Sequence, residues 1–251
     1  PFYHKKSHQG VLRHLVIRKA GTTGEILVNL VTTSQRELKL AGLVERLQQL
    51  KLMGRIKGFL HTINDGKADA IQADALHVLW GDDYITERIL GLTFRVTAFS
   101  FFQTNSYGAE RLFSIVRDFA GQGLGVVYDL YCGTGTIAQI ISPQAEKVIG
   151  IEIVPEAIEA ARENARLNGL DNCRFIAGDV LAELDSLEEQ PGLIILDPPR
   201  SGIHPKALEK LAAIRPPRLV YVSCQPASLA RDLQALTASG YKAEKVKCVD
   251  M

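Results

Sequence analysis

The stretch 219–226 carries a cysteine in a setting that favours nucleophilic chemistry. The apolar run 219–222 predicts a buried strand, and Cys224 follows it within two residues. Pro226 suits the first turn of a helix, so a helix is expected to begin at once. A thiol at this junction meets the positive end of a helix dipole, which favours the thiolate. The alternative is a small apolar residue that ends a strand, and the rest of the chain must decide between them.

A glycine-rich turn and an acid one strand later indicate a nucleoside-containing cofactor. Residues 129–136 read Asp-Leu-Tyr-Cys-Gly-Thr-Gly-Thr and span the end of a predicted strand at 125–131 and the turn that follows it. Glycines let the backbone approach a ligand closely. Glu152 ends the next predicted strand, 147–153, where a carboxylate can hold a ribose diol. The turn lacks the third glycine of the GxGxxG pattern, and a packing role is its alternative.

Two further acids end predicted strands. Asp179 follows the strand 174–177, where a carboxylate can accept a hydrogen bond from an adenine amino group, and a helix cap is its alternative role. Residues 197–200 read Asp-Pro-Pro-Arg and close the strand 193–196. Two prolines make a rigid exit from the strand, which aims Asp197 toward a cleft.

The elements that position these residues alternate between strand and helix from about residue 96 onward. Short strands separated by helices predict an α/β fold, a doubly wound Rossmann-like parallel sheet with helices on both faces. Ligands of such sheets bind at the carboxyl ends of the strands. The residues that the strand ends would bring to this edge are Glu152, Asp179, Asp197 and Cys224.

Residues 1–95 form a different pattern, which predicts a smaller, strand-rich α+β lobe. It contains no catalytic motif. Apolar residues recur at helical spacing from Leu40 through Met53. The predicted strands are 12–18 and 25–31, joined as a hairpin, followed by 55–62, 76–79 and 92–96.

The net charge of +1 hides an asymmetry between these lobes. Residues 1–95 carry 14 Lys and Arg against 9 Asp and Glu, whereas residues 96–251 carry 15 against 19. A basic lobe beside a mildly acidic one suits a phosphate-contacting platform next to a catalytic domain.

Composition excludes several other classes. No apolar run approaches the roughly 20 residues of a membrane helix, so we expect no membrane partner. The cysteines at 132, 173, 224 and 248 have no CxxC spacing, so no metal site or disulfide framework is predicted. Free thiols indicate the reducing cytoplasm, and we expect a monomer. The chain begins at Pro1, which suggests a piece of a longer protein.

The glycine turn, Glu152, the Asp-Pro-Pro-Arg loop and the Ser-Cys-Gln-Pro sequence at 223–226 together resemble the S-adenosylmethionine-dependent RNA uracil-5-methyltransferases. The segment 100–105, Ser-Phe-Phe-Gln-Thr-Asn, looks like the family's cofactor-contacting segment. The resemblance runs from about Phe94 to the end, and a weaker one to the family's RNA-contacting central module covers 11–93. The ribosomal-RNA branch, with 23S ribosomal RNA as substrate, fits better than the transfer-RNA branch, which is the alternative.

The resemblance assigns roles residue by residue. It implies that Cys224 is the nucleophile, which adds to C6 of uracil so that C5 can take the methyl group. The target uridine must be flipped out of any stacked helix. Thr136 departs from the asparagine often found at its position. The residues that match S-adenosyl-L-methionine-contacting positions are Gln103, Tyr131, Thr136, Glu152, Asp179 and Asp197.

The resemblance also implies parts that would lie outside this sequence. The family's proton-abstracting glutamate would follow Met251, so the catalytic domain, 96–251, is expected to be truncated at its C-terminus. Such a piece should bind the cofactor and form the adduct but release product poorly. The iron–sulfur cluster of some members and their N-terminal RNA-binding barrel would lie upstream of Pro1, and a cluster is possible only there.

Three alternatives have different signatures. RNA cytosine-5-methyltransferases typically pair a second cysteine, after the fourth strand, with the one after the fifth, and residues 198–200 contain none. An amino-methyltransferase would have an aromatic residue in place of Arg200. A non-catalytic RNA-binding protein with a vestigial cofactor fold would form no covalent adduct through Cys224.

Overall fold

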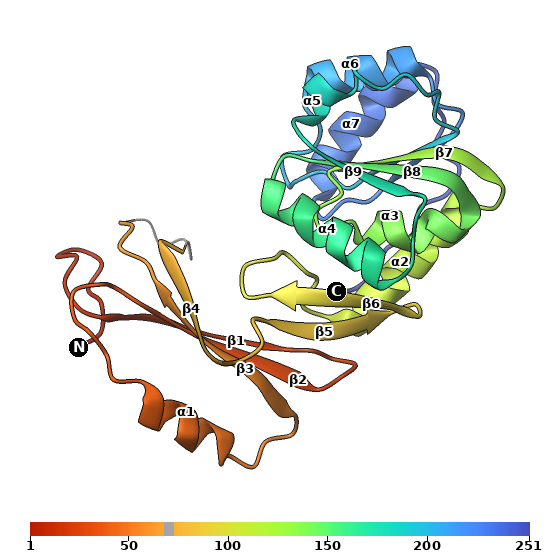
Figure 1. The fold of residues 1–251 in the computed structure, drawn as a ribbon. Coiled ribbons are helices and arrows are strands. Elements are labelled where there is room, and N and C mark those ends of the chain that lie inside the picture. Colours follow the sequence, from red (N-terminus) through yellow and green to blue (C-terminus); the bar gives the residue numbers. More distant parts are fainter. Residues whose placement is uncertain (68–72) are drawn as a thin grey trace. The chain divides into compact units, whose positions relative to one another are not determined.

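The computed structural model describes residues 1–67 and 73–251, which divide into two compact units (Figure 1). The first unit comprises Pro1–Arg88 and Arg95–Ser100, and the second comprises Ile89–Phe94 and Phe101–Met251. The chain therefore passes between the units three times, after Arg88, after Phe94 and after Ser100.

The first unit is built on a four-stranded sheet with the order β1-β2-β3-β4. β1 and β2 form the predicted antiparallel hairpin, whereas β2 and β3 are parallel and are connected through α1. The predicted strands at 55–62 and 76–79 are confirmed as β3 and β4. The elements are β1 Leu12–Lys19, β2 Glu25–Thr32, α1 Ala41–Gln48, β3 Arg55–Ile63 and β4 Ala75–Gly81.

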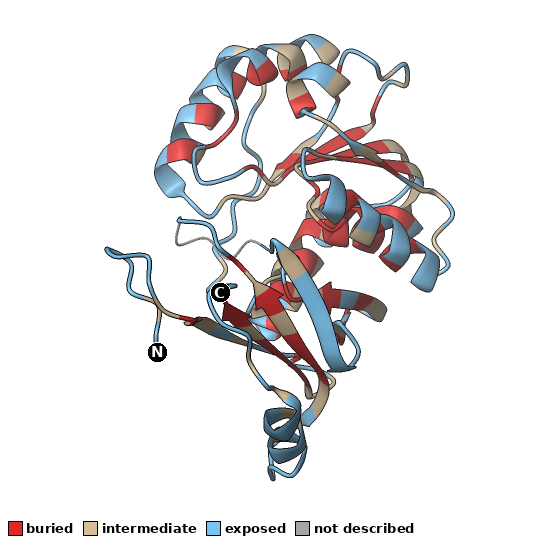
Figure 2. Cartoon of the chain, turned by 60° about the vertical axis from the view of Figure 1, so that its left-hand side comes forward, coloured by how far each residue is buried: buried red, intermediate tan, exposed pale blue. Residues whose placement is uncertain are grey.

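Helix α1 is shorter than its apolar periodicity predicts. It ends at Gln48, and the expectation of a helix through Met53 is wrong. No residue of α1 is fully buried, and the helix of the first unit is mostly exposed in Figure 2. From α1, Val44 and Leu47 pack against the cluster of Ile26, Val28 and Phe59. Because most helical stability comes from packing an apolar face, so little burial does not sustain another turn.

The hairpin at 84–97 contains a strand that the sequence analysis missed. β5 (Tyr84–Ile89) pairs with β6 (Leu92–Thr97) as a two-stranded sheet. The pattern was hidden because Glu87 occupies an inward position and is buried. Its carboxylate accepts hydrogen bonds from the backbone N–H groups of Gly21 at 2.7 Å and Thr22 at 2.9 Å. These donors offset the cost of burying an acid.

The second unit confirms the predicted α/β architecture. Its five-stranded sheet has the order β11-β10-β7-β8-β9, and all pairings are parallel. Helices cover both faces of this sheet (Figure 1). The elements are α2 Ser106–Ala120, β7 Leu124–Leu130, α3 Thr136–Ile141, a 3₁₀ turn at Ser142–Gln144, β8 Ala145–Glu152, α4 Pro155–Leu167, β9 Cys173–Ala177, α5 Val180–Glu183, β10 Leu193–Leu196, α6 Pro205–Ile214, β11 Leu219–Tyr221 and α7 Pro226–Ala238.

β10, an inner strand of this sheet, shows how burial on both faces stabilises the sheet. Its four residues, Leu-Ile-Ile-Leu, are all fully buried. Leu193 and Ile195 join the core with α2, α3 and α4, whereas Ile194 and Leu196 join the core with α5, α6 and α7. Each such side chain contributes about 1.5–3 kcal/mol of burial free energy. A continuous apolar run of this kind is typical of a strand that is covered on both faces.

A search of the helices in the described residues finds none with the length and apolar character needed to cross a membrane.

Candidate active site

The strand order brings five loop segments side by side at the carboxyl edge of the parallel sheet. β10 pairs with β11 on one side and β7 on the other, and β8 continues the row to β9. Leu196 lies opposite both Leu130 and Tyr221, so the residues that follow these three strands are neighbours. In spatial order, the loops carry Cys224, Asp197, Tyr131, Glu152 and Asp179.

Gly133 and Gly135, the two glycines of the turn after β7, serve different structural purposes. Both adopt the left-handed region, with φ of +53° at Gly133 and +70° at Gly135. A methyl group on Gly135 would lie 2.6 Å from a ring carbon of Phe175 and 2.9 Å from Cβ of Ala161, so Gly135 is required for packing. No atom lies within 4 Å of the same position on Gly133, which therefore leaves an open approach to the backbone.

Glu152 ties this turn to the loop that follows β8. Its Oε2 accepts a hydrogen bond from the N–H of Gly133 at 3.1 Å, and its Oε1 accepts one from the N–H of Val154 at 3.1 Å. The next two side chains, Ile153 and Val154, are 62% and 46% exposed although both are apolar. An apolar platform beside a carboxylate suits a nucleoside, with its base on the apolar groups and its ribose on the acid. The sequence analysis missed this platform, although an apolar pair directly after the acid was a usable signal.

Two carboxyl groups, one fully buried and one partly buried, lie next to this turn. Asp129, near the end of β7, is completely buried; its Oδ2 accepts a hydrogen bond from the N–H of Ala138 at 2.8 Å, and its Oδ1 has no partner among the described residues. Burial raises the pKa of Asp129 to about 8, and the charges of Asp197 and Glu152 contribute to the increase. Burial also raises the pKa of Asp197 to about 6. The sequence analysis missed Asp129 because a strand residue gives no sign of its neighbours' charges.

Cys224 is presented to solvent by a tight turn between β11 and α7. Ser223 Oγ accepts a hydrogen bond from the N–H of Gln225 at 3.1 Å and donates one to the Gln225 carbonyl at 3.0 Å. Ser228 Oγ donates to the same carbonyl at 3.0 Å. Pro226 occupies the first turn of α7, which confirms the predicted strand-to-helix junction.

The other two cysteines of the sheet region, Cys132 and Cys173, are poorly placed to act as nucleophiles. Cys132 is buried, and burial together with the charges of Asp129 and Glu152 raises its pKa well above the ordinary value. Burial raises the pKa of Cys173 to about 11. Burial thus disfavours the nucleophilic thiolate at Cys132 and Cys173, whereas Cys224 is exposed and accessible to a substrate.

Tyr131 and Asp179 lie on neighbouring parts of the same edge. Tyr131 is held in the left-handed region, with φ of +65°, which is unfavourable for a residue with a Cβ. Burial raises the pKa of its hydroxyl to about 12, and the charges of Asp179 and Asp232 contribute to the effect. Asp179 is exposed and caps α5, with its Oδ1 accepting from the N–H of Ala182 at 3.2 Å. The capping role is therefore present, and a ligand contact would have to be made in addition.

The remaining predicted contacts lie at helix starts. Thr136 is the first residue of α3 and is buried, with its hydroxyl 3.4 Å from that of Thr134. Gln103 is half-buried and precedes α2, which the N-cap Asn105 begins by accepting from the N–H of Gly108 at 3.0 Å. The C-terminus of α2 leads directly into β7, so its N-terminus points back toward the carboxyl edge of the sheet.

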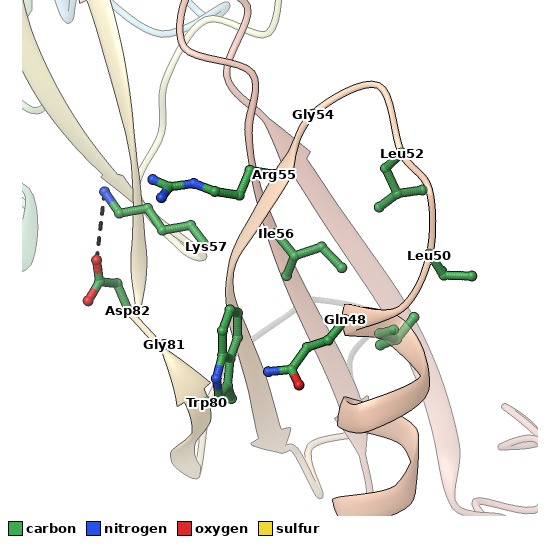
Figure 3. A pocket seen from close by; sticks show the side chains of 11 residues that line it. Gln48, Leu50, Leu52, Gly54, Arg55, Ile56, Lys57, Trp80, Gly81 and Asp82 are labelled. Atoms are coloured by element: carbon green, nitrogen blue, oxygen red, sulfur yellow. Dashed lines mark ion pairs between the residues drawn. The ribbon is translucent and has the colours of Figure 1, made fainter.

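A separate groove lies wholly within the first unit (Figure 3). Its volume is about 610 Å³, and an ion pair between Lys57 and Asp82, at 3.7 Å, borders it. In this view the Gln48 side chain points toward Trp80, and Ile56 lies beside the two. None of the candidate site residues lines this groove.

The described residues fit a nucleoside cofactor on three counts. Gly133 leaves space at the backbone, Glu152 offers a carboxylate, and Ile153 and Val154 offer exposed apolar surface. The unpartnered Oδ1 of Asp129 adds a polar atom without a hydrogen bond in the interior below the turn. All these groups belong to the adjacent strands β7 and β8 and the loops that follow them, where doubly wound sheets bind nucleotides.

Comparison with protein families and curated proteins gives consistent results. Residues 123–247 match the family described as "Methyltransferase domain". The whole chain is 55% identical to an uncharacterized RNA methyltransferase of Clostridium tetani and 44% identical to one of Porphyromonas gingivalis. The chain spans only 55% of the length of each of these relatives.

Among solved structures, the tRNA (uracil-54, C5)-methyltransferase of Pyrococcus abyssi, in complex with S-adenosyl-L-homocysteine, resembles this chain with a TM-score of 0.76. The two are 29% identical, and the match covers 92% of this chain and 54% of that one. The second unit thus has the Rossmann-like fold of S-adenosylmethionine-dependent methyltransferases.

Proposed function

We propose that this chain, which carries the class I methyltransferase fold and is similar along its whole length to RNA methyltransferases, transfers a methyl group to C5 of a uridine in RNA. The observation that carries the proposal is the exposed thiol of Cys224, which follows β11, next to the strand that leads to the partly buried carboxyl of Asp197. The similar Pyrococcus abyssi protein, which is named as a uracil C5 methyltransferase, supports the same reaction.

The cofactor is S-adenosyl-L-methionine, which supplies an electrophilic methyl group on a sulfonium sulfur. Glu152 would hold the ribose, and the exposed Ile153 and Val154 would receive the adenine. Tyr131, Asp197 and Gln103 would complete the pocket from the neighbouring loops. Thr136 and Asp179 would contribute from the starts of α3 and α5, where both already serve the local structure.

Cys224 has the central chemical role in this proposal. Uracil C5 is too weak a nucleophile to be methylated unaided. Addition of the thiolate to C6 forms an S–C6 bond and moves the C5–C6 π electrons into an enolate, which makes C5 nucleophilic. After C5 has gained the methyl group, loss of its proton to a base restores the double bond and expels the thiolate. Asp197 would hold the uracil edge or the cofactor beside this thiol.

RNA is the proposed partner, and the first unit is its proposed platform. Residues 1–95 carry a net charge of about +5, which favours contact with phosphates. A reaction at C5 and C6 requires an unstacked uridine, so loops are preferred targets. We take 23S ribosomal RNA as the first candidate substrate, on the resemblance of the segment 100–105. Transfer RNA is the second candidate, because the similar Pyrococcus abyssi enzyme is named for it.

A trapped adduct tests the mechanism directly. RNA that contains 5-fluorouridine cannot lose a C5 proton after methylation, so a Cys224 adduct should persist as a slowly migrating band under denaturing conditions. The full-length protein should form this band with ribosomal RNA and the cofactor. Cys224→Ala should abolish it, and Cys248→Ala, at a second exposed cysteine, should retain it.

The same experiment separates the alternatives. Cofactor binding without an adduct would contradict the proposed nucleophile and favour a non-catalytic RNA-binding protein. An adduct with transfer RNA alone would replace the first candidate substrate by the second. An adduct with 5-fluorocytidine RNA but not with 5-fluorouridine RNA would contradict the choice of uracil.

A further inference from the structure

One carboxylate of the second unit is completely buried and yet lies outside the set of residues described as the site. Asp232 occupies the middle of α7, on the face that also buries Ser228 and Leu236. A buried carboxylate is stable only where it is paired and hydrogen-bonded. The identity of its donors therefore shows which parts of the chain it holds.

Four hydrogen bonds reach Asp232. Its Oδ2 accepts from the N–H of Ile203 at 2.8 Å and from the hydroxyl of Tyr221 at 2.7 Å. Its Oδ1 accepts from Nε and Nη2 of Arg231, at 2.9 Å and 2.7 Å. Nη2 of Arg231 also donates to the carbonyl of Ser201 at 2.8 Å. One carboxylate thus joins α7, the end of β11 and the loop after β10.

Each of these segments is short and leads to a proposed functional side chain. The loop after β10 starts with Asp197, four residues before Ser201. Tyr221 is the last residue of β11, three residues before Cys224. The helix α7 begins two residues after Cys224. The hydrogen-bonded cluster therefore includes residues before and after Cys224 in the chain. It also includes residues near the end of the loop that begins with Asp197.

Packing leaves this cluster little freedom. A methyl group on Gly202, whose φ is +78°, would lie 2.5 Å from Oδ2 of Asp232 and 3.0 Å from Cβ of Ser228. The loop backbone is therefore pressed against α7 at this glycine. Burial and the neighbouring Asp232 also raise the pKa values of Tyr221 and Tyr131, so the influence of this carboxylate extends to the glycine turn.

We propose that Asp232 is a positioning residue that, through Arg231 and Tyr221, clamps the Asp197 loop to α7 and fixes Asp197 relative to the Cys224 thiol. This rests on the proposed function, in which the Cys224 thiol adds to uracil and Asp197 holds the uracil edge or the cofactor beside it. Orientation dominates such reactions, and a displacement of about 1 Å far from the reacting atoms can cost roughly 10²-fold in rate. The cofactor-facing groups on β8 do not depend on the clamp.

The test compares Asp232→Asn with Asp185→Asn in the full-length protein. The control removes the same charge from an ion pair with Lys210 in which the Asp185 side chain is 72% exposed. Asp232→Asn should lower kcat for RNA methylation about 10²-fold while KM for RNA stays near wild type. Tyr221→Phe removes one hydrogen-bond donor and leaves the ion pair between Arg231 and Asp232, so kcat should fall less. It is the milder variant if Asp232→Asn does not fold.

Amide hydrogen exchange supplies a readout that does not depend on catalysis. The N–H of Ile203 should exchange faster in Asp232→Asn and Tyr221→Phe, and at the wild-type rate in Asp185→Asn. Wild-type exchange in all three variants would overturn the clamp. Faster exchange with wild-type kcat would show a purely structural role and would overturn positioning. A wild-type protein without methylation activity would refute the proposed function, while the exchange result would still decide whether the clamp exists.

Discussion

Replacing Asp197 by asparagine should make the protein more stable at neutral pH while it loses activity. Burial raises the pKa of this carboxyl from 3.8 to about 6. The folded state therefore holds the proton more tightly than the unfolded chain does. Ionisation then opposes folding, so stability from this group decreases as the pH rises between about 4 and 6 and is constant above that range.

The size of the expected stability change follows from this change in the pKa of Asp197. A change from 3.8 to about 6 corresponds to about 3 kcal/mol, since each pH unit is worth roughly 1.4 kcal/mol. Asp197→Asn is nearly isosteric and cannot ionise, so it should gain up to about 3 kcal/mol over wild type at pH 8 and much less at pH 4. The Asp197 charge also raises the pKa of Asp129, so the variant should lower that pKa as well.

Urea unfolding at pH 4 and pH 8, followed by circular dichroism at 222 nm, measures this difference. Asp185→Asn serves as the exposed control and should change the free energy of unfolding by less than about 0.5 kcal/mol. Methylation activity should fall strongly in Asp197→Asn. A variant less stable than wild type at pH 8, or a stability difference independent of pH, would refute the reasoning.

Two further predictions concern the same sheet edge. Iodoacetamide should modify Cys224 readily in the native protein and should leave Cys132 and Cys173 unmodified until the protein unfolds, because burial raises the pKa of these two thiols. Peptide mass spectrometry over time would detect any early labelling of Cys132 or Cys173. Gly135→Ala should cost about 2–4 kcal/mol of unfolding free energy, from backbone strain and overpacking, whereas Gly133→Ala should cost about 1 kcal/mol and act mainly on cofactor affinity. Calorimetric titration with S-adenosyl-L-homocysteine, together with urea unfolding, would show whether the two glycines differ in this way.

The fold of the second unit was predictable because one rule fixes most of it. Strands that alternate with helices form a parallel sheet, and a parallel sheet places every strand's carboxyl end on the same edge. The residues that follow the strands, such as Glu152, Asp197 and Cys224, were therefore expected at one edge before any coordinate was known. Local signals were sufficient where a motif such as Pro226 marks the start of a helix.

Other features depend on contacts that no local pattern reveals. Asp232 has the sequence context of an ordinary polar position in a helix, and its donors come from three separate segments. Glu87 interrupts the apolar pattern of a strand, although backbone N–H groups of a distant turn satisfy its carboxylate. The length of α1 was overestimated because periodicity predicts a helix whether or not a core exists to receive its apolar face.

The charges and the backbone strain at the carboxyl edge of the parallel sheet indicate that this edge binds a ligand. Asp129 is close enough to Glu152 and to Asp197 for their charges to raise its pKa, and it leaves one oxygen without a partner among the described residues. Tyr131, between them, adopts a strained backbone conformation. Each feature lowers the stability of the unliganded fold, and a neutral side chain in place of Asp129 or Asp197 would remove part of that cost. Unfavourable features that collect where a ligand would enter are the mark of function, since selection for stability alone would have eliminated them.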